Sequence, residues 1–197
     1  MAYAIIGSGK IGSALARLLA RSGIAAAIAN ARGPDSIAPL VDELGGSLSA
    51  VPIKEALQAE VLFLAIPFAA ITTFAQQAGD LTGKIVIDAM NAFNAPPELL
   101  RGRMSSEVVA DALPGARVVK AFNHLPAGVL ARDPTQDGGR RVIYVSSNDA
   151  GAASDVAALA GRLGFAPISI GRIDEGGRLL QVNGPLLLHN LVEHSLK

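Results

Sequence analysis

Three glycines at a fixed spacing are the first feature of this sequence that points to chemistry. Gly7-Ser8-Gly9-Lys10-Ile11-Gly12 follows an apolar run over 3–6 and precedes apolar residues at helical spacing, which predicts a tight strand-to-helix turn. In such a turn the first glycine permits the bend, the second lets the backbone approach a pyrophosphate, and the third lets the helix pack on the strand. The free N–H groups of the helix then face the phosphates. The motif therefore predicts a dinucleotide site.

The residues after the second expected strand indicate which dinucleotide binds. An NAD site usually has Asp or Glu at this place, where the carboxylate binds the ribose hydroxyls. Here the sequence reads Asn30-Ala31-Arg32. A carboxylate would repel a 2′-phosphate, whereas Asn30 can donate a hydrogen bond to it and Arg32 can form charge-assisted bonds. These residues favour NADP over NAD.

Three residues near this site have a second interpretation. Asp35 can serve as the ribose carboxylate of an NAD site, although its place after Pro34 suits the first turn of a helix. Ser36 either reaches the phosphate or is a surface serine at a helix start. Lys10 either adds a positive charge near the phosphates or is a solvated lysine. The sequence alone leaves these alternatives open.

Apolar runs typical of strands alternate with helical patterns along the chain. Continuous apolar strands joined by helices predict an α/β fold of the Rossmann type, with a doubly wound and mostly parallel sheet. We expect one dinucleotide-binding domain over 1–197, in which 123–197 extends the sheet, supplies the acceptor side and ends in a helix kinked at Gly184-Pro185. Expected strands are 3–6, 25–29, 47–50, 61–66, 84–88, 117–122, 141–146 and 166–170, and expected helices after the first are 34–44, 54–59, 69–78, 105–113, 150–163 and 179–196.

The carboxyl ends of these strands supply the other candidate site residues, because parallel strands end at a shared crevice. Pro67 either holds its loop extended beside the dinucleotide or only ends a strand. His124 either donates to, or protonates, an acceptor or is a plain polar loop residue. We assign no firm catalytic residue and keep Asn123 and His124 as candidates. The expected lining residues are Ala65, Ile66, Pro67 and Phe68 after the fourth strand, Ala89, Met90 and Asn91 after the fifth, and Ala121 after the sixth.

Composition excludes several function classes. The 17 basic and 17 acidic residues give a net charge of zero, without the basic patch that nucleic-acid binding needs. The chain has no Cys, and His189 and His194 are not spaced to share a helix face, so we expect no metal site. An export signal and a membrane span are not expected, which predicts a cytoplasmic protein. The apolar final helix is a candidate homodimer contact.

Four segments carry a resemblance to a known family: Gly7 to Gly12, Asn30 to Arg32, Ala65 to Phe68 and Val118-Val119-Lys120-Ala121-Phe122-Asn123. Together they resemble the NADP oxidoreductase, coenzyme F420-dependent family. That family includes NADPH:F420 reductases and is similar to the reductase domain of the six-transmembrane metalloreductases. The resemblance implies hydride transfer between the nicotinamide of NADP(H) and a flat ring acceptor, either the deazaflavin F420 or a flavin. At Asn123-His124 the sequence departs from F420 reductases, which tend to have His then Thr there, and looks closer to the metalloreductases.

Two other functions remain open at this stage. The first is a reductase of another small electrophile, such as an imine or a quinone. The second is a non-catalytic NADP-binding redox sensor that reports to a protein partner. Hydride transfer depends on holding the donor and the acceptor close and excluding water, so the pocket lining matters more than any acid or base.

Overall fold

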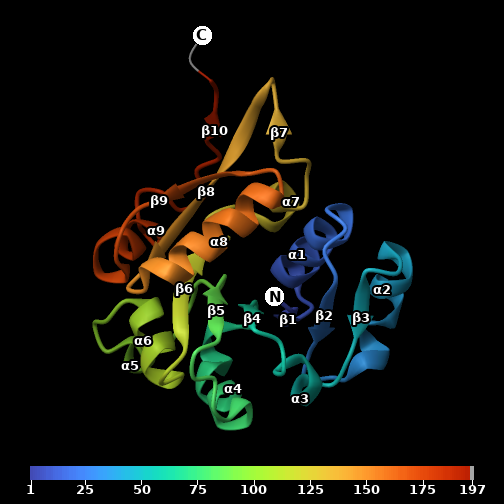
Figure 1. Ribbon diagram of the computed structural model, residues 1–197. Helices are drawn as coiled ribbons and strands as arrows, with labels where there is room; N and C mark the ends of the chain where they lie inside the picture. Colours follow the sequence, from blue (N-terminus) through green and yellow to red (C-terminus); the bar gives the residue numbers. More distant parts are fainter. Residues whose placement is uncertain (196–197) are drawn as a thin grey trace.

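Residues 1–195 are described by a computed structural model, in which helices cover both faces of one sheet (Figure 1). The strands are β1 (Tyr3–Ile6), β2 (Ala26–Ala29), β3 (Leu48–Ala50), β4 (Val61–Leu64), β5 (Ile85–Asp88), β6 (Arg117–Ala121), β7 (Thr135–Gln136), β8 (Gly139–Ser147), β9 (Ala166–Ser169) and β10 (Val192–Glu193). The helices are α1 (Lys10–Arg21), α2 (Ala38–Leu44), α3 (Ile53–Ala56), α4 (Ile71–Ala78), α5 (Pro97–Leu100), α6 (Ser105–Ala112), α7 (Ala127–Leu130), α8 (Ala150–Arg162) and α9 (Arg178–Leu180). No helix in this range is both long and apolar enough to cross a membrane.

The order of the strands creates a crevice beside β1. The sheet runs β10-β8-β6-β5-β4-β1-β2-β3, and the pairs from β3 to β6 are all parallel. The chain moves from β1 outward to β2 and β3, then crosses back to β4 on the other side of β1. Ligands of doubly wound sheets bind at such a reversal, outside the carboxyl ends of the strands. The predicted Rossmann-type fold is confirmed.

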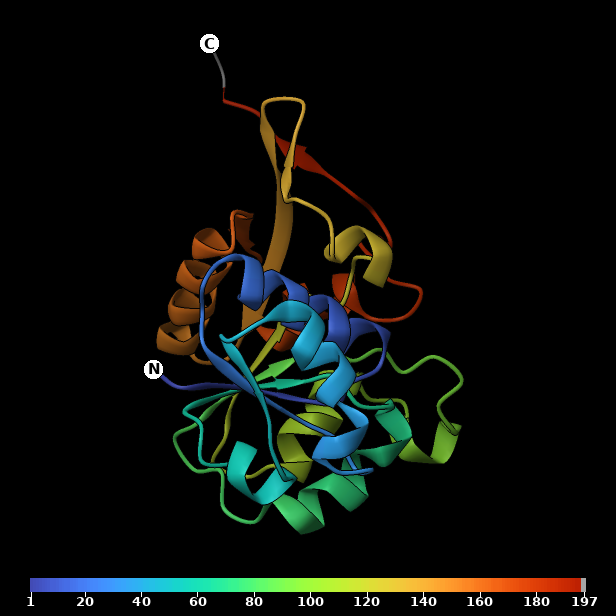
Figure 2. The ribbon, with the colours of Figure 1, turned by 90° about the vertical axis from the view of Figure 1, so that its right-hand side faces the viewer.

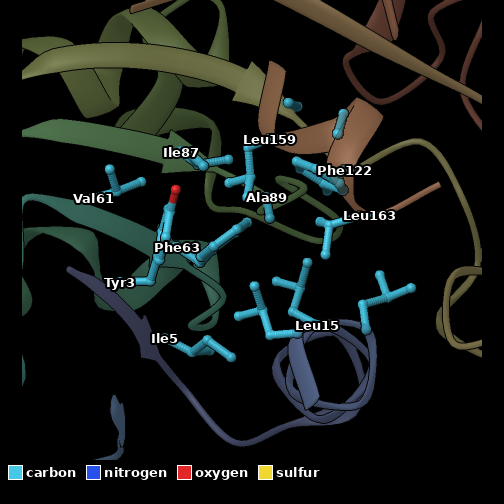
Figure 3. Close-up of a cluster of buried hydrophobic side chains, with 14 of the residues drawn as sticks. Tyr3, Ile5, Leu15, Val61, Phe63, Ile87, Ala89, Phe122, Leu159 and Leu163 are labelled. Carbon is cyan, nitrogen blue, oxygen red and sulfur yellow. The ribbon is translucent and has the colours of Figure 1, made fainter. Parts of the chain in front are cut away.

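Two hydrophobic cores lie on opposite faces of the sheet. Successive strand residues point to opposite faces, so Ile5 and Phe63 pack against α1 and α8, whereas their neighbours Ile6 and Leu64 pack toward α4 and α6. Figure 3 shows the first core, where Leu15 from α1 and Leu159 and Leu163 from α8 point toward the strand side chains. Burial on both faces explains why the central strands are continuously apolar.

A fully buried ion pair joins β5 to β6 just below the crevice. The Lys120 ammonium lies 3.1 Å from the Asp88 carboxylate, and neither side chain reaches solvent. Lys120 also donates to the backbone carbonyl of Met90, and the Ser106 hydroxyl donates to Asp88 at 2.8 Å. Burial lowers the pKa of Lys120, and Asp88 opposes that shift. The pair thereby fixes the backbone that leaves β5 toward the crevice.

Residues 133–140, which lie outside the expected strands and helices, form part of a hairpin. Thr135–Gln136 forms β7, which pairs antiparallel with the start of β8. Asp137 and Gly138 make the turn with φ of 51° and 76°. An Asp-Gly pair is typical of such two-residue turns, which require positive φ at both positions. That signal was present in the sequence. Figure 2 shows the hairpin running out beyond the rest of the fold.

The prediction of a kinked helix over 179–196 is wrong. α9 ends at Leu180, turns follow, and Val192–Glu193 forms β10, which pairs antiparallel with β8. Asn183 and Leu188 have φ of 67° and 65°, which breaks any helix, and Pro185 cannot donate a helical hydrogen bond. The dimer contact expected of this helix therefore loses its structural basis. Residues 196 and 197 lie outside the described residues.

Smaller differences occur at Pro34 and along the strand ends. The helix expected over 34–44 is a 3₁₀ turn at Pro34–Ser36 followed by α2, which begins beside Pro39. Phe68–Ala70 is likewise a 3₁₀ turn that leads into α4. The strand expected over 61–66 ends at Leu64, which leaves Ala65 and Ile66 in the loop above the sheet.

We predict that Lys120→Met lowers the free energy of unfolding by about 3–5 kcal/mol, because it leaves the buried Asp88 carboxylate without its countercharge. Urea unfolding followed by circular dichroism measures this loss. Lys54→Met is the matched control, since Lys54 is exposed. A loss no larger than that of the control would contradict the assigned role of the buried pair.

Candidate functional site

The glycine turn after β1 is built by backbone contacts that exclude side chains. Gly7 has φ of 108°, and a Cβ there would overlap the carbonyl group of Ala65 after β4. A Cβ on Gly12 would overlap the carbonyl group of Gly7. Gly9 differs, because a Cβ there would have no atom within 4 Å. The protein itself does not need the space at Gly9, so this position is open for a ligand.

The N-terminus of α1 faces the same space. No side chain makes a capping hydrogen bond at Gly9, and no acidic residue lies in the first turn. The first N–H groups of a helix need partners, and their partial positive charge suits an anion. The turn and the helix together therefore fit the pyrophosphate of a dinucleotide.

Asn30 organises the end of β2 beside this turn. Its Nδ2 donates to the hydroxyl oxygens of Ser8 at 2.6 Å and Ser36 at 2.9 Å. Its Oδ1 accepts from the backbone N–H of Arg32 at 2.8 Å. Both amide hydrogens of Asn30 are thus used within the protein. The Ser36 hydroxyl is also used, because it donates to the Gly33 carbonyl at 2.8 Å. The guanidinium of Arg32 has no hydrogen bond or ion pair within residues 1–195, so Arg32 is better placed to meet a phosphate.

A cleft of about 420 Å³ lies at the strand-order reversal, and we call it the β1–β4 cleft. Sequence reasoning missed the part of its wall from α3 and α4, although Thr73 and Gln77 are one helical turn apart. No carboxylate lines it. The lining residues are Ile6, Gly7, Ser8, Gly9, Asn30, Ala31, Arg32, Ile53, Ala65, Ile66, Pro67, Ala70, Thr73, Phe74 and Gln77.

A second hollow of about 290 Å³ adjoins it over the ends of β5 and β6, and we call it the β5–β6 pocket. Ala65 and Ile66 line both spaces, so the two adjoin each other. Phe93 and Leu188 at its wall are 53% and 58% exposed. Leu188 comes from the C-terminal segment, and no local sequence motif predicts that this segment reaches the pocket. The lining residues are Lys10, Ile11, Ala65, Ile66, Ala89, Met90, Asn91, Phe93, Asn123, Leu125, Pro126, Ala127 and Leu188.

Four of the predicted cofactor residues, Gly12, Ser36, Phe68 and Ala121, lie outside these two spaces. Phe68 is buried in the core on the α4 face, and Ala121 in the core on the α1 face. Gly12 packs under Gly7, and Ser36 contacts Asn30. Lys10 lines the β5–β6 pocket rather than the β1–β4 cleft. A larger and more open hollow of about 600 Å³ between α4, α5 and α6 contains none of the predicted site residues.

His124 is fully buried rather than exposed at a strand end. Its ring packs edge-on against Tyr144 with centroids 5.0 Å apart, and neither ring nitrogen has a partner within residues 1–195. Burial, which the nearby backbone of Val142 opposes only in part, lowers the pKa of His124 to about 4. The imidazole is therefore neutral at physiological pH and does not line the β5–β6 pocket. Its role as a proton donor stays a prediction.

Titratable side chains do not gather into a metal site in the part of the chain that the structure describes. No group of three or more His, Asp or Glu side chains lies close enough there to hold an ion. The two hollows instead offer backbone N–H groups, one unpaired guanidinium, three asparagines and apolar walls. Such a lining can bind and orient a phosphorylated ligand and a flat ring beside it.

We predict that His124 makes the folded state less stable as the pH falls from about 6.5 to about 4. In this window the unfolded chain binds a proton that the folded chain does not bind, so the free energy of unfolding decreases. The pKa difference corresponds to at most about 3 kcal/mol. Urea unfolding across this pH range should show a smaller decrease in His124→Phe than in the wild type. His189→Phe, at an exposed position, is the control, and equal pH dependence in both variants would count against this role.

Comparisons with known proteins identify relatives of this chain. Residues 2–92 match the sequence model of the family described as NADP oxidoreductase coenzyme F420-dependent. The metalloreductase STEAP3 of Rattus norvegicus is 32% identical over 172 residues, which are 86% of this chain and 33% of that protein. The chain thus spans about a third of the length of that relative.

Two solved structures show the same fold over nearly the whole chain. The hypothetical protein SMa0349 from Sinorhizobium meliloti is 47% identical with a TM-score of 0.93, covering 98% of this chain and 96% of that one. A putative F420-dependent NADP-reductase from Arthrobacter sp. FB24 is 26% identical with a TM-score of 0.75, covering 88% and 86%. The chain therefore belongs to the family of NADP-dependent oxidoreductases described as NADP oxidoreductase coenzyme F420-dependent.

Proposed function

We propose that the protein transfers a hydride between NADP(H), bound in the β1–β4 cleft with its nicotinamide reaching the β5–β6 pocket, and a planar ring acceptor, a deazaflavin or a flavin, that stacks at the open side of this pocket. The observation that carries this proposal is the adjacency of the two spaces, which share Ala65 and Ile66 in their walls. When bound, the nicotinamide supplies the hydride chemistry, and the protein supplies position and exclusion of water.

The β1–β4 cleft has the features that a phosphorylated dinucleotide needs. Open space at Gly9 and the uncapped N-terminus of α1 suit the pyrophosphate. The unpaired guanidinium of Arg32 suits a 2′-phosphate, and no carboxylate lines the cleft to repel it. Asp35 is exposed and does not line the cleft, which weakens the NAD alternative.

The β5–β6 pocket suits a flat ring more than a substrate that needs acid or base catalysis. Its walls are mostly apolar, with Phe93 and Leu188 exposed at the edge. Lys10 is the charged side chain among its lining residues. A ring that accepts a hydride gains negative charge, which an ammonium group stabilises electrostatically. Lys10 is therefore our candidate for this role, in place of a contact with the pyrophosphate.

Turnover of NADPH with a panel of acceptors tests the function. We expect the wild type to oxidise NADPH with F420, FMN or FAD, measured by the loss of absorbance of the reduced nicotinamide. Gly9→Val is the control, because its side chain meets no protein atom near the Cβ yet fills the open space for phosphate. It should fold normally and show no turnover.

Two outcomes of this panel would redirect the assignment. Turnover with a quinone or a cyclic imine alone would replace the ring acceptor by another small electrophile. Tight binding of NADPH without turnover of any acceptor would contradict catalysis and favour the redox sensor. The cytoplasmic location and a homodimer stay predictions from the sequence.

Coenzyme choice gives a separate prediction. We expect Arg32→Ala to weaken NADP binding by at least about tenfold, which is 1.4 kcal/mol, with little change for NAD. Isothermal titration calorimetry with both coenzymes measures the difference. Arg172→Ala is the matched control, because Arg172 is exposed, pairs only with Asp174 and lines neither hollow. A much smaller loss for NADP would show that Arg32 does not contact the phosphate.

A further inference from the structure

Two asparagine side chains are locked together at the ends of β5 and β6. The Nδ2 of Asn91 donates to the backbone carbonyl of Asn123 at 2.7 Å. The Nδ2 of Asn123 donates to the Oδ1 of Asn91 at 2.9 Å and to the backbone carbonyl of Leu180 at 2.8 Å. Both residues line the β5–β6 pocket. We call them the Asn91–Asn123 pair.

The pair has hydrogen-bonding capacity that the protein does not use. A side-chain amide has two donor hydrogens and an oxygen with two lone pairs. Both hydrogens of Asn123 are used, whereas Asn91 uses one hydrogen and one lone pair. The Oδ1 of Asn123 is buried and has no partner within residues 1–195. Asn91, which is half-buried, therefore retains one donor hydrogen and one acceptor lone pair, whereas the unused oxygen of Asn123 is buried behind it.

What remains on Asn91 matches a primary carboxamide, whose N–H group and oxygen can each form one hydrogen bond with it. The pyrimidine edge of a flavin or deazaflavin also has an N–H group beside a carbonyl oxygen, so hydrogen-bonding capacity alone fits both groups. Position favours the carboxamide, because the nicotinamide of NADP(H) carries such a group and the β5–β6 pocket adjoins the β1–β4 cleft at Ala65 and Ile66.

We propose that Asn91 binds the carboxamide of the nicotinamide and that Asn123 is a positioning residue that holds Asn91 in place. This inference rests on the proposed function, because it requires NADP(H) in the β1–β4 cleft. Asn91 is half-buried at the pocket wall, whereas Asn123 is almost fully buried behind it. Hydrogen bonds to the carboxamide fix the rotation of the ring, and this rotation decides which ring face meets the acceptor.

A coenzyme analogue separates this contact from a general loss of structure. The 3-acetylpyridine analogue of NADP⁺ has a methyl ketone in place of the carboxamide, so it keeps the acceptor oxygen and lacks both donor hydrogens. Calorimetry gives the dissociation constants of NADP⁺, the analogue and adenosine 2′,5′-bisphosphate, which has no nicotinamide. These are measured for the wild type, Asn91→Ala and Asn123→Ala.

We expect Asn91→Ala to weaken NADP⁺ binding at least about fivefold more than binding of the analogue, since the analogue has no N–H group to lose. Binding of adenosine 2′,5′-bisphosphate should stay within about twofold of the wild type, which shows that the variant is folded. Asn94→Gly is the matched control, because Asn94 is exposed, has φ of 55° and lines neither hollow. It should change none of the three constants.

Asn123→Ala should show the same preference for the analogue if it acts by orienting Asn91. Equal weakening of NADP⁺ and the analogue in Asn91→Ala would overturn the inference, as would a loss confined to flavin binding. If only Asn123→Ala weakened all three ligands equally, its role as a positioning residue would be withdrawn. Failure of the wild type to bind both NADP⁺ and adenosine 2′,5′-bisphosphate would overturn the proposed function as well.

Discussion

At the end of β1 three backbone segments approach so closely that no side chain fits between them. The carbonyl of Gly7 lies under Gly12 of α1, and the carbonyl of Ala65 lies against Gly7. These contacts fix the N-terminus of α1 relative to β4, and a hydrogen bond from the Gly7 N–H to the Ala29 carbonyl, at 2.7 Å, fixes it relative to β2. Contacts between main-chain atoms therefore position the part of each hollow that these segments line.

Much of this arrangement follows from local sequence. The glycine spacing, the continuous apolar runs and the helical patterns between them are short-range signals, and each is sufficient to predict an element. Because parallel strands end at one edge, the residues that follow 61–66 and 84–88 could be assigned to a shared site before the structure was known. Most of the residues assigned in this way line one of the two hollows.

The parts that local sequence did not predict depend on contacts between distant segments. The burial of His124 against Tyr144 depends on where β8 packs, and the hydrogen bond from Asn123 to the Leu180 carbonyl joins residues 57 positions apart. The apolar run over 179–196 looks helical by spacing, yet it pairs with β8 at its end because that edge has unpaired backbone groups. For the hairpin over 133–140, in contrast, the Asp137-Gly138 pair is a local signal that predicts the turn.

Polar groups inside the molecule make the pocket walls stiff. Lys120, Asp88 and the Met90 carbonyl hold the chain that leaves β5, and the asparagine amides then join it to the chain that leaves β6. Networks of this kind confine side chains to one arrangement when their members are paired. A site on such supports loses little conformational freedom when a ligand binds, which favours affinity without large movements.

The C-terminal segment ties the projecting hairpin to the pocket through a very short length of chain. The N–H of Leu188 donates to the His124 carbonyl at 2.8 Å, and the Leu191 carbonyl accepts from the N–H of Val142 in β8 at 2.9 Å. Leu188 and Leu191 are three positions apart, so a shift of β10 along β8 would also move the Leu188 side chain. A molecule that grips or displaces this hairpin would therefore also move the Leu188 side chain at the wall of the β5–β6 pocket.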